Sequence, residues 1–224
     1  MHRDWSSFDL VDQIAIVTGA SQGIGRTLAI ALAQAGADVA LVSRTRSDLE
    51  TVAKEIEAAG RQALVIPTDI QDVSQIRKMV DAVHTTFGKI DILINNAAWT
   101  ATVEALEATE EEWDQTLDTS LKAIFFASQA AAKIMIQQGR GKIVNIGSTL
   151  GRTAFAKRSV YGAAKAGVHQ LTRVLALEWA DKGVNVNAVA TCITETPTRR
   201  EVFERPGDRE WATGQMLPIG RGAQ

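Results

Sequence analysis

Hydrophobic residues recur along the chain in short continuous runs that alternate with longer segments of helical periodicity. The continuous runs, rich in valine, isoleucine, leucine and alanine, predict six buried strands, at residues 13–20, 38–44, 62–70, 90–98, 141–148 and 184–191. The periodic segments predict helices at residues 23–37, 47–60, 73–88, 110–138 and 159–183. Gly36 and Gly183 fit the left-handed turn that often follows a helix. Ser47, with Glu50 three residues later, fits a helix N-cap.

Strands that alternate with helices predict a parallel sheet with helices on both faces, because each parallel connection needs a crossover. The expected fold class is α/β, a doubly wound sheet of the Rossmann type, with residues 1–224 forming a single domain. In such folds ligands bind beyond the carboxyl ends of the strands. Polar residues gather at those ends, for example at Thr18-Gly19, Asn95-Asn96 and Gly147-Ser148. The pattern therefore favours a binding site along that edge.

The composition excludes several classes of protein. Hydrophobic residues make up 46% and charged residues 22%, as in an ordinary globular protein, and the net charge is −2. No basic excess supports binding to nucleic acid or to a membrane, so neither partner is expected. One cysteine, Cys192, excludes an internal disulfide, and with three scattered histidines no metal site is visible. Without a signal-peptide pattern or a long apolar segment, a cytoplasmic protein is expected.

The segment TGASQGIG, residues 18–25, follows the first strand and opens the first helix. Its glycines permit a tight turn and let a pyrophosphate approach the helix amides, where the helix dipole favours an anion. No Gly-Lys-Ser/Thr sequence follows, so the P-loop pattern does not apply. The alternative is a glycine-rich turn without a ligand. The residues expected to bind a dinucleotide here are Gly19, Ser21, Gln22, Gly23, Ile24 and Gly25.

The end of the second strand indicates which dinucleotide is bound. NAD-binding proteins place an acidic residue there for the ribose 2′-hydroxyl, whereas NADP-binding proteins place an arginine for the 2′-phosphate. The segment SRTRSD supplies Arg44 at this point, and its first acid, Asp48, comes later, at the start of a helix. A guanidinium group suits a phosphate, so NADP(H) is favoured over NAD(H). In the alternative interpretation, Arg44 stacks on adenine or is only solvated.

The chain resembles the short-chain dehydrogenase/reductase family over residues 10–220. The resemblance rests on the loop at residues 18–25, Asp69, the Asn95-Asn96-Ala97-Ala98 segment, Ser148 and the Tyr161-Gly-Ala-Ala-Lys165 motif. Ser148 lies 13 residues before Tyr161, which is the family's spacing.

The resemblance implies roles for individual residues. Asp69 and Ile70 would contact adenine, Asn96 would form the wall of the nucleotide site, and Ala97 and Ala98 would lie beside the ribose. Tyr161 would be the general acid or base and would also contact the cofactor, and Lys165 would bind the nicotinamide ribose and lower the tyrosine pKa. Ser148 would hydrogen-bond the substrate oxygen. Thr196, with the backbone near Thr194, would hold the nicotinamide carboxamide.

The chemistry of these residue types agrees independently with the resemblance. Carbonyl reduction needs a hydride donor on one face and a proton donor at the oxygen. A free phenol titrates near pH 10, and a nearby cation stabilises the phenolate and lowers that pKa. Positions i and i+4 bring Tyr161 and Lys165 to one face of a helix. Ser148 at a strand end can polarise the same oxygen. A core aromatic and a strand-end cap are the alternatives for Tyr161 and Ser148.

Three positions depart from the family pattern. The family's fourth catalytic residue, an asparagine that holds a water linking the lysine to solvent, falls on Ser120, so a weakened proton relay is expected. Ala98 replaces a glycine and would be strained if its φ were positive. The usual Pro-Gly after the sixth strand is Thr191-Cys192, which faces the nicotinamide; there Cys192 is either a modifiable thiol or a small buried residue.

The last part of the chain and the substrate pocket carry weaker signals. The sequence ends where the family has a further helix and edge strand, so the fold is expected to lack these elements and its oligomeric assembly or stability to be altered. Residues 195–214 would form the family's substrate lid. The residues expected to contact a substrate are Ser148, Trp99, Leu150 and Phe155. Family members usually assemble as dimers or tetramers through their long helices, so a homodimer or homotetramer is expected.

Two functions remain open from the sequence. The first is an NADP(H)-dependent oxidoreductase that acts on a small-molecule carbonyl or secondary alcohol. The alternative is an NADP-binding sensor or interaction protein of the same fold with little catalysis. The departures at Ser120, Ala98 and Thr191-Cys192 favour the alternative, and the intact Tyr161 and Lys165 favour the enzyme.

Overall fold

The computed structural model describes residues 9–192, 194 and 196. The strands and long helices follow one another as β1 (Ile14–Thr18), α1 (Gly23–Gln34), β2 (Asp38–Ser43), α2 (Arg46–Ala58), β3 (Ala63–Pro67), α3 (Val73–Phe87), β4 (Ile92–Asn95), α4 (Glu110–Leu117), α5 (Ala123–Gln138), β5 (Gly141–Ser148), α6 (Ser159–Trp179) and β6 (Val184–Thr191). Three short helical turns are the π-helical η1 (Asp118–Lys122) and the 3₁₀ turns η2 (Thr149–Gly151) and η3 (Ala180–Lys182).

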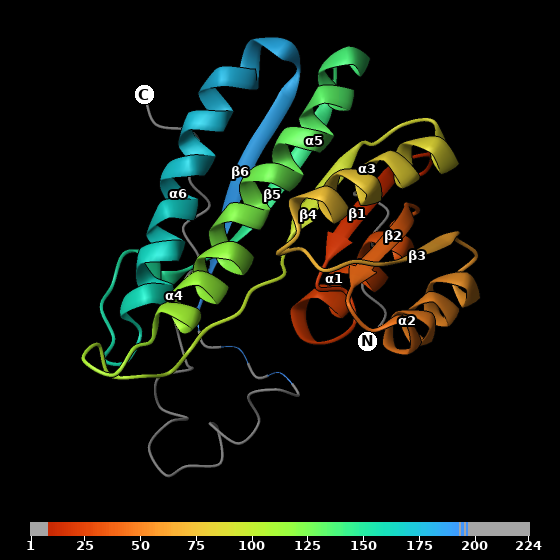
Figure 1. The fold of residues 1–224 in the computed structure, drawn as a ribbon. Helices are drawn as coiled ribbons and strands as arrows, with labels where there is room; N and C mark the ends of the chain where they lie inside the picture. Colours follow the sequence, from red (N-terminus) through yellow and green to blue (C-terminus); the bar gives the residue numbers. More distant parts are fainter. Residues whose placement is uncertain (1–8, 193, 195, 197–224) are drawn as a thin grey trace.

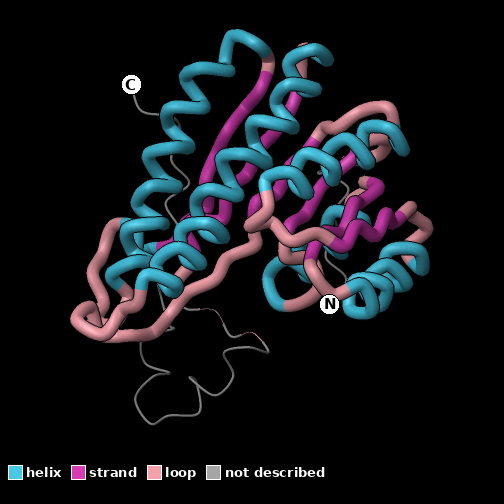
Figure 2. The backbone as a smooth tube through the Cα atoms, viewed as in Figure 1, coloured by secondary structure: helices cyan, strands magenta, loops and turns pink. Residues whose placement is uncertain are grey.

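The six strands form one parallel sheet in the order β3-β2-β1-β4-β5-β6 (Figure 1). The strand order reverses between β1 and β4, so the crevice between their carboxyl ends is the expected ligand site of such a sheet. Helices cover both faces, which confirms the predicted doubly wound fold (Figure 2).

Two apolar clusters explain why the strands are hydrophobic without alternation. Ile14 and Ile16 of β1 face the layer made by α3, α5 and α6, whereas Ala15 and Val17 face α1 and α2. Because successive side chains of a strand point to opposite faces, a strand buried on both faces needs apolar residues at every position.

The structure corrects some predicted boundaries. Ser47 is not the N-cap of α2, because the helix begins at Arg46 after Thr45, and no side chain caps it. The helical segment predicted at residues 110–138 is interrupted by the π-helical turn η1, a feature that often marks a functional site. The strands β1 and β4 end earlier than predicted, at Thr18 and Asn95, and β1 is followed by Gly19, whose φ of 65° leaves the extended conformation.

Some expectations fall at the end of the chain. The predicted lid at residues 195–214 lies outside the described residues except for Thr196, and the expected loss of a last helix and edge strand concerns that same undescribed part. Within the part that is described, β6 is an edge strand that pairs with β5 alone. No helix among these residues combines the length and the apolar character that a membrane span requires.

Candidate active site

The loop between β1 and α1 has the backbone shape that its glycines predict. Gly19 and Gly23 adopt positive φ values of 65° and 57°, which side chains disfavour. A Cβ on Gly25 would lie 2.1 Å from the Gly19 carbonyl oxygen, so only glycine fits. Neither a side-chain cap nor an acidic residue occupies the first turn of α1, and its amide groups therefore suit an anion. The loop fits a dinucleotide pyrophosphate, with Ser21, Gln22 and Ile24 among its residues.

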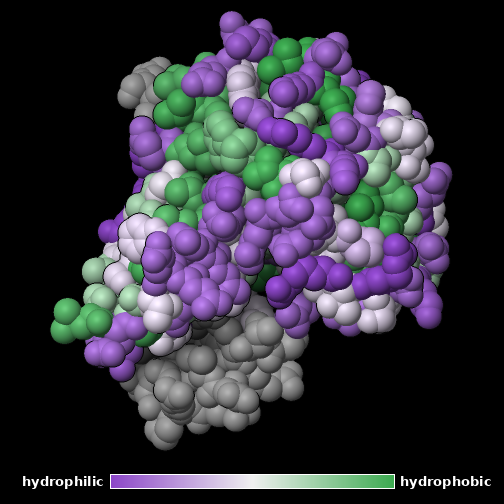
Figure 3. All heavy atoms as spheres, viewed as in Figure 1, coloured by the Kyte–Doolittle hydropathy of each residue, from purple (hydrophilic) through white to green (hydrophobic). Residues whose placement is uncertain are grey.

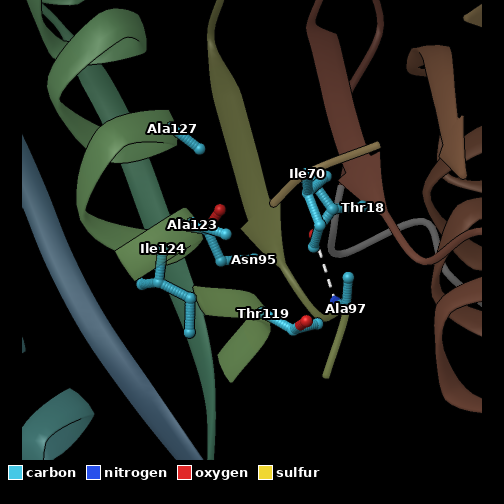
Figure 4. A pocket seen from close by; sticks show the side chains of 8 residues that line it. All are labelled: Thr18, Ile70, Asn95, Ala97, Thr119, Ala123, Ile124 and Ala127. Carbon is cyan, nitrogen blue, oxygen red and sulfur yellow. Dashed lines mark hydrogen bonds between the residues drawn. The ribbon is translucent and has the colours of Figure 1, made fainter. Parts of the chain in front are cut away.

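Thr18 joins this loop to the end of β4. Its hydroxyl accepts a hydrogen bond from the backbone N–H group of Asn96, at 3.0 Å. It also accepts one from the N–H group of Ala97, at 3.1 Å (Figure 4). The Asn96 side-chain amide donates in return to the carbonyls of Thr18, at 3.0 Å, and Gly19, at 3.3 Å. Asn96 is therefore part of the wall beside the glycine loop. Thr18 was not among the predicted site residues, since a threonine at a strand end carries no specific signal.

A small pocket lies beside Thr18, between α5 and the carboxyl ends of β1 and β4 (Figure 4). Its lining residues are Thr18, Ile70, Asn95, Ala97, Thr119, Ala123, Ile124 and Ala127. The Thr119 hydroxyl is buried and has no hydrogen-bond partner among the residues described. It can therefore bond to a water or ligand atom that enters the pocket. Ile70 and Ala97, both predicted to touch the nucleotide, meet in this lining.

Arg44 lies on the loop between β2 and α2, at the edge where the dinucleotide ribose is expected. Its guanidinium is exposed and forms no hydrogen bond or ion pair within the described part of the chain. Arg46, by contrast, pairs with Glu50 at 3.7 Å. Asp69 lies at the same sheet edge after β3, where its carboxylate accepts the Gln71 N–H at 3.0 Å. Arg44 is therefore available for a phosphate.

Ser148 ends β5 and is buried beside the start of α6. Its hydroxyl accepts the Leu150 N–H at 3.2 Å and so fixes the turn η2. The turn packs closely on α6, because a Cβ on Gly162 would lie 3.3 Å from the Leu150 carbonyl oxygen. Gly162 follows Tyr161 directly, so the turn with Ser148 and the helix with Tyr161 are neighbours.

Tyr161 and Lys165 share one face of α6. The Lys165 ammonium nitrogen lies 5.6 Å from the centre of the Tyr161 ring. The Lys165 side chain is 1% exposed and donates a hydrogen bond of 2.7 Å to the Ile146 carbonyl of β5. Burial lowers the pKa of its ammonium to about 8, because a charge is poorly solvated there. The group still remains mostly protonated at neutral pH and supplies positive charge next to the phenol.

A buried polar chain ties the helices of the site together beneath these residues. The Asn95 amide donates to the Ser128 hydroxyl of α5, at 3.0 Å, and to the Asn145 side chain of β5, at 2.9 Å. Asn145 donates in turn to the Thr172 hydroxyl of α6, at 2.9 Å. Because each link is satisfied in a buried setting, the chain fixes α5 and α6 relative to the sheet.

Ser120 lies at the centre of η1 and is fully buried. Its hydroxyl accepts the Trp99 N–H at 3.1 Å and donates to the Trp99 carbonyl at 2.8 Å. The single hydroxyl proton is therefore directed at the Trp99 backbone, and Ser120 holds the segment that follows β4. Ala98, in the same segment, is not strained, because Asp12 and Lys157 are the non-glycine residues with positive φ in the described structure.

The remaining predicted site residues lie in the segment after β6 and in the loop before α6, and they differ in solvent exposure. A Cβ on Gly23 would lie 3.2 Å from the Thr196 methyl, so the segment after β6 approaches the glycine loop. Thr194 is exposed and donates to the Cys192 carbonyl at 3.1 Å. Cys192 is a free, half-buried thiol. Phe155 lies on the loop before α6 and is 63% exposed. The carboxyl edge therefore gathers the glycine loop, Asn96 and Ser148.

Comparisons with known proteins agree with this arrangement. The sequence model of the short chain dehydrogenase family matches residues 13–207. The chain is 40% identical over 186 residues to a 2-dehydro-3-deoxy-D-gluconate 5-dehydrogenase of Escherichia coli K12, covering 83% of this chain and 73% of that protein. It is 39% identical over 177 residues to a 3-oxoacyl-[acyl-carrier-protein] reductase of Staphylococcus aureus Mu50, covering 79% and 72%.

A solved structure extends the similarity to three dimensions. A short-chain type dehydrogenase/reductase from Mycobacterium marinum superposes with a TM-score of 0.84 at 36% identity, covering 88% of this chain and 79% of that one. The residues that the family model matches, 13–207, include all six strands of the sheet. The chain therefore belongs to the short-chain dehydrogenase/reductase family and is an oxidoreductase of that nicotinamide-dependent family.

Proposed function

We propose that the protein is an NADP(H)-dependent oxidoreductase that transfers a hydride between the nicotinamide and a carbonyl or secondary alcohol, with Tyr161 as general acid and base. The observation that carries the proposal is the buried Lys165 ammonium, 5.6 Å from the Tyr161 ring on the same helix face. Burying a cation is costly, so strongly perturbed buried charges cluster at functional sites, and here the cation favours the ionised form of the neighbouring phenol.

A nicotinamide cofactor held at this site would supply or accept the hydride, and the residues of this chain would move the proton. During reduction, Tyr161 donates its hydroxyl proton to the carbonyl oxygen as the carbonyl carbon receives the hydride. Lys165 stabilises the tyrosinate that this leaves. Ser148 donates a hydrogen bond to the same oxygen and stabilises the charge that develops on it. In the oxidation direction, the tyrosinate accepts the proton of the alcohol.

Other residues would hold the cofactor and the substrate. The glycine loop with Ser21, Gln22 and Ile24 suits the pyrophosphate, and Asn96, Ala97 and Ala98 border the nucleotide. Asp69 and Ile70 would contact adenine, and Thr194 and Thr196 the carboxamide. Arg44 is exposed and forms no ion pair within the described residues. It therefore supports the choice of NADP(H), since a guanidinium binds a 2′-phosphate well. Trp99, Leu150 and Phe155 would border the substrate.

The substrate class follows from the relatives by analogy. Their names specify a keto sugar acid in one case and a 3-oxoacyl thioester in the other. Both substrates place a carbonyl or a secondary alcohol near other polar groups. The test measures NADPH and NADH binding by fluorescence and then cofactor turnover with 2-dehydro-3-deoxy-D-gluconate, a 3-oxobutanoyl thioester and a panel of simple ketones and sugars.

The expected result is tighter NADPH than NADH binding, with turnover of at least one panel member. Binding without turnover of any panel member would favour the alternative, an NADP-binding sensor. Tighter NADH binding would remove the role proposed for Arg44. One feature that favours the sensor is Ser120, because its hydroxyl forms hydrogen bonds with the Trp99 backbone and so is not free to hold the water of a proton relay.

The protein is further proposed to be cytoplasmic and to self-associate as a dimer or tetramer. Apolar residues gather over α5 and α6 on the molecular surface (Figure 3). Leu177 and Val174 of α6 are 80% and 39% exposed, and Trp113 of α4 is 48% exposed. Exposed apolar side chains on neighbouring helices favour an interface. Size-exclusion chromatography with light scattering tests this, and a monomer at all concentrations would rule the assembly out.

A further inference from the structure

His169 lies on α6 one turn after Lys165 and packs beneath the turn that carries Ser148. A Cβ on Gly147 would lie 2.6 Å from the His169 Nε2 atom, and a Cβ on Gly151 would lie 2.7 Å from its Cε1 atom. The imidazole therefore occupies the space that two glycines leave open, one just before Ser148 and one three residues after it. The ring therefore packs against the backbone on both sides of Ser148.

The environment of the ring favours its neutral form. His169 is 8% exposed, and its Nε2 atom is buried without a hydrogen-bond partner among the residues described. The charged groups that act on it are all cations, with Arg152 beyond η2 and with Lys165 and Arg173 on α6. Gly147, the strand residue that lies against the ring, is uncharged. Burial, and then these cations, lower the pKa of His169 below its ordinary value of 6.5.

We propose that His169 is a positioning residue for catalysis, whose neutral imidazole holds the Gly147–Gly151 turn so that the Ser148 hydroxyl faces the reacting oxygen. The inference rests on the proposed function, since it gives Ser148 a role in turnover. An apolar side chain could fill the same space. The histidine differs in one respect, because it becomes charged in acid.

Protonation changes the fit of the ring against the turn. It places a hydrogen on both ring nitrogens and so creates a buried N–H donor without an acceptor at Nε2. It also adds a fourth positive charge to a group of three. Both costs are relieved when the turn moves away from α6, and the Ser148 hydroxyl moves with it. Turnover therefore falls at a pH below 6.5, although acid by itself keeps Tyr161 protonated and ready to donate.

The test is a double-mutant cycle between His169 and Ser148, followed with the fastest-reduced carbonyl of the panel described above. His169→Ala is expected to lower kcat about 10- to 100-fold, since small displacements of a catalytic group are costly. In a Ser148→Ala background, the same change is expected to alter kcat by less than about twofold, because its effect passes through Ser148. NADPH binding, measured by fluorescence, stays unchanged in both.

The pH profile supplies the second readout. His169→Gln keeps a side chain of similar length that cannot be protonated. This variant should retain turnover at pH 7 and should not show the fall in turnover below pH 6.5 that is expected of the parent protein. His84→Gln, on the exposed face of α3, is the matched control and should keep that decline. Thermal unfolding verifies that each variant is folded.

The outcomes separate two failures. If the parent protein turns over no member of the panel, the proposed function fails, and the role of His169 fails with it. If Ser148→Ala leaves turnover unchanged, the proposed function stands, but the roles given to Ser148 and His169 are both wrong. If Ser148→Ala lowers kcat, but His169→Ala lowers kcat in that background as much as it does in the parent protein, the positioning role alone is wrong. The same holds if turnover of His169→Gln still falls below pH 6.5.

Discussion

Lys165 lies one turn after Tyr161 on α6, with its ammonium 5.6 Å from the phenol ring and its only described hydrogen bond directed at the Ile146 carbonyl. The helix thus presents the phenol at the edge of the sheet and keeps its cation buried behind it. The arrangement places charge where it alters the chemistry of the phenol while shielding that charge from solvent.

Replacing Tyr161 by phenylalanine should abolish proton transfer without disturbing the fold. The variant loses the hydroxyl alone, so we expect kcat to fall by at least about 10²-fold, the usual contribution of a general acid. NADPH affinity should change little, because the ring and Lys165 remain. Stopped-flow turnover and fluorescence titration measure the two quantities. A variant that retains full turnover would show that another group donates the proton.

Replacing Lys165 by methionine should stabilise the protein at neutral pH while it removes activity. The folded pKa of about 8 lies below the ordinary value of 10.5, so below pH 8 folding carries the full cost of a buried charge. That cost is on the order of a few kcal/mol, at about 1.4 kcal/mol per pKa unit, and the lost bond to Ile146 offsets part of the gain.

The sign of the pH dependence follows from proton uptake. Between pH 8 and 10.5 the unfolded chain binds more protons at Lys165 than the folded chain, so the stability of the parent protein rises with pH. The advantage of Lys165→Met should therefore shrink over this range and be constant below it. Urea unfolding of both proteins from pH 7 to 10 measures the difference, and a pH-independent difference would contradict the shifted pKa.

Arg44→Ala should weaken NADPH binding by about 10- to 100-fold, the worth of a charge-assisted hydrogen bond of about 1.5–3 kcal/mol. NADH affinity should stay nearly constant, because NADH carries no 2′-phosphate. Arg46→Ala is the matched control, since Arg46 already pairs with Glu50. Equal losses for both cofactors would mean that Arg44 stacks on the adenine instead.

Gly25→Ala should disrupt the dinucleotide loop. The added methyl would lie 2.1 Å from the Gly19 carbonyl and 2.4 Å from the Asn96 amide nitrogen, so the loop must open. We expect loss of detectable cofactor binding and a lower melting temperature. Gly60→Ala is the control, because a Cβ there meets nothing within 4 Å and only its φ of 79° is unfavourable. Intact binding in Gly25→Ala would remove the loop from the cofactor site.

Ser120→Ala should loosen the segment after β4, since the Trp99 N–H and carbonyl both lose their partner. The expected effect is a higher KM for substrate with unchanged NADPH affinity. Ser120→Asn tests the separate hypothesis that serine weakens a proton relay. Higher kcat in that variant would support the hypothesis, and unchanged or lower kcat would count against it.

Much of the fold was predictable from local pattern. Apolar residues at every position of β1 and β2 require burial on both faces, and so a parallel sheet between helix layers. The glycines at 19, 23 and 25 fit the turn that they form, because two of them have positive φ and the third touches backbone. The spacing of Tyr161 and Lys165 placed them on one helix face before the fold was known. Helix ends were less predictable, since Ser47 fits an N-cap by local pattern although α2 begins at Arg46.

The sequence alone determined the fold class, the dinucleotide loop and the candidate Tyr161–Lys165 pair, because each depends on the geometry of one element or one turn. The tertiary structure decided which partners those residues meet. Ser120 contacts the Trp99 backbone, and His169 reaches Gly147, because crossovers and strand register bring them together. The burial that lowers the Lys165 pKa comes from the same packing of α6 on β5. Contacts between distant segments carry no local period, so only the assembled sheet specifies them.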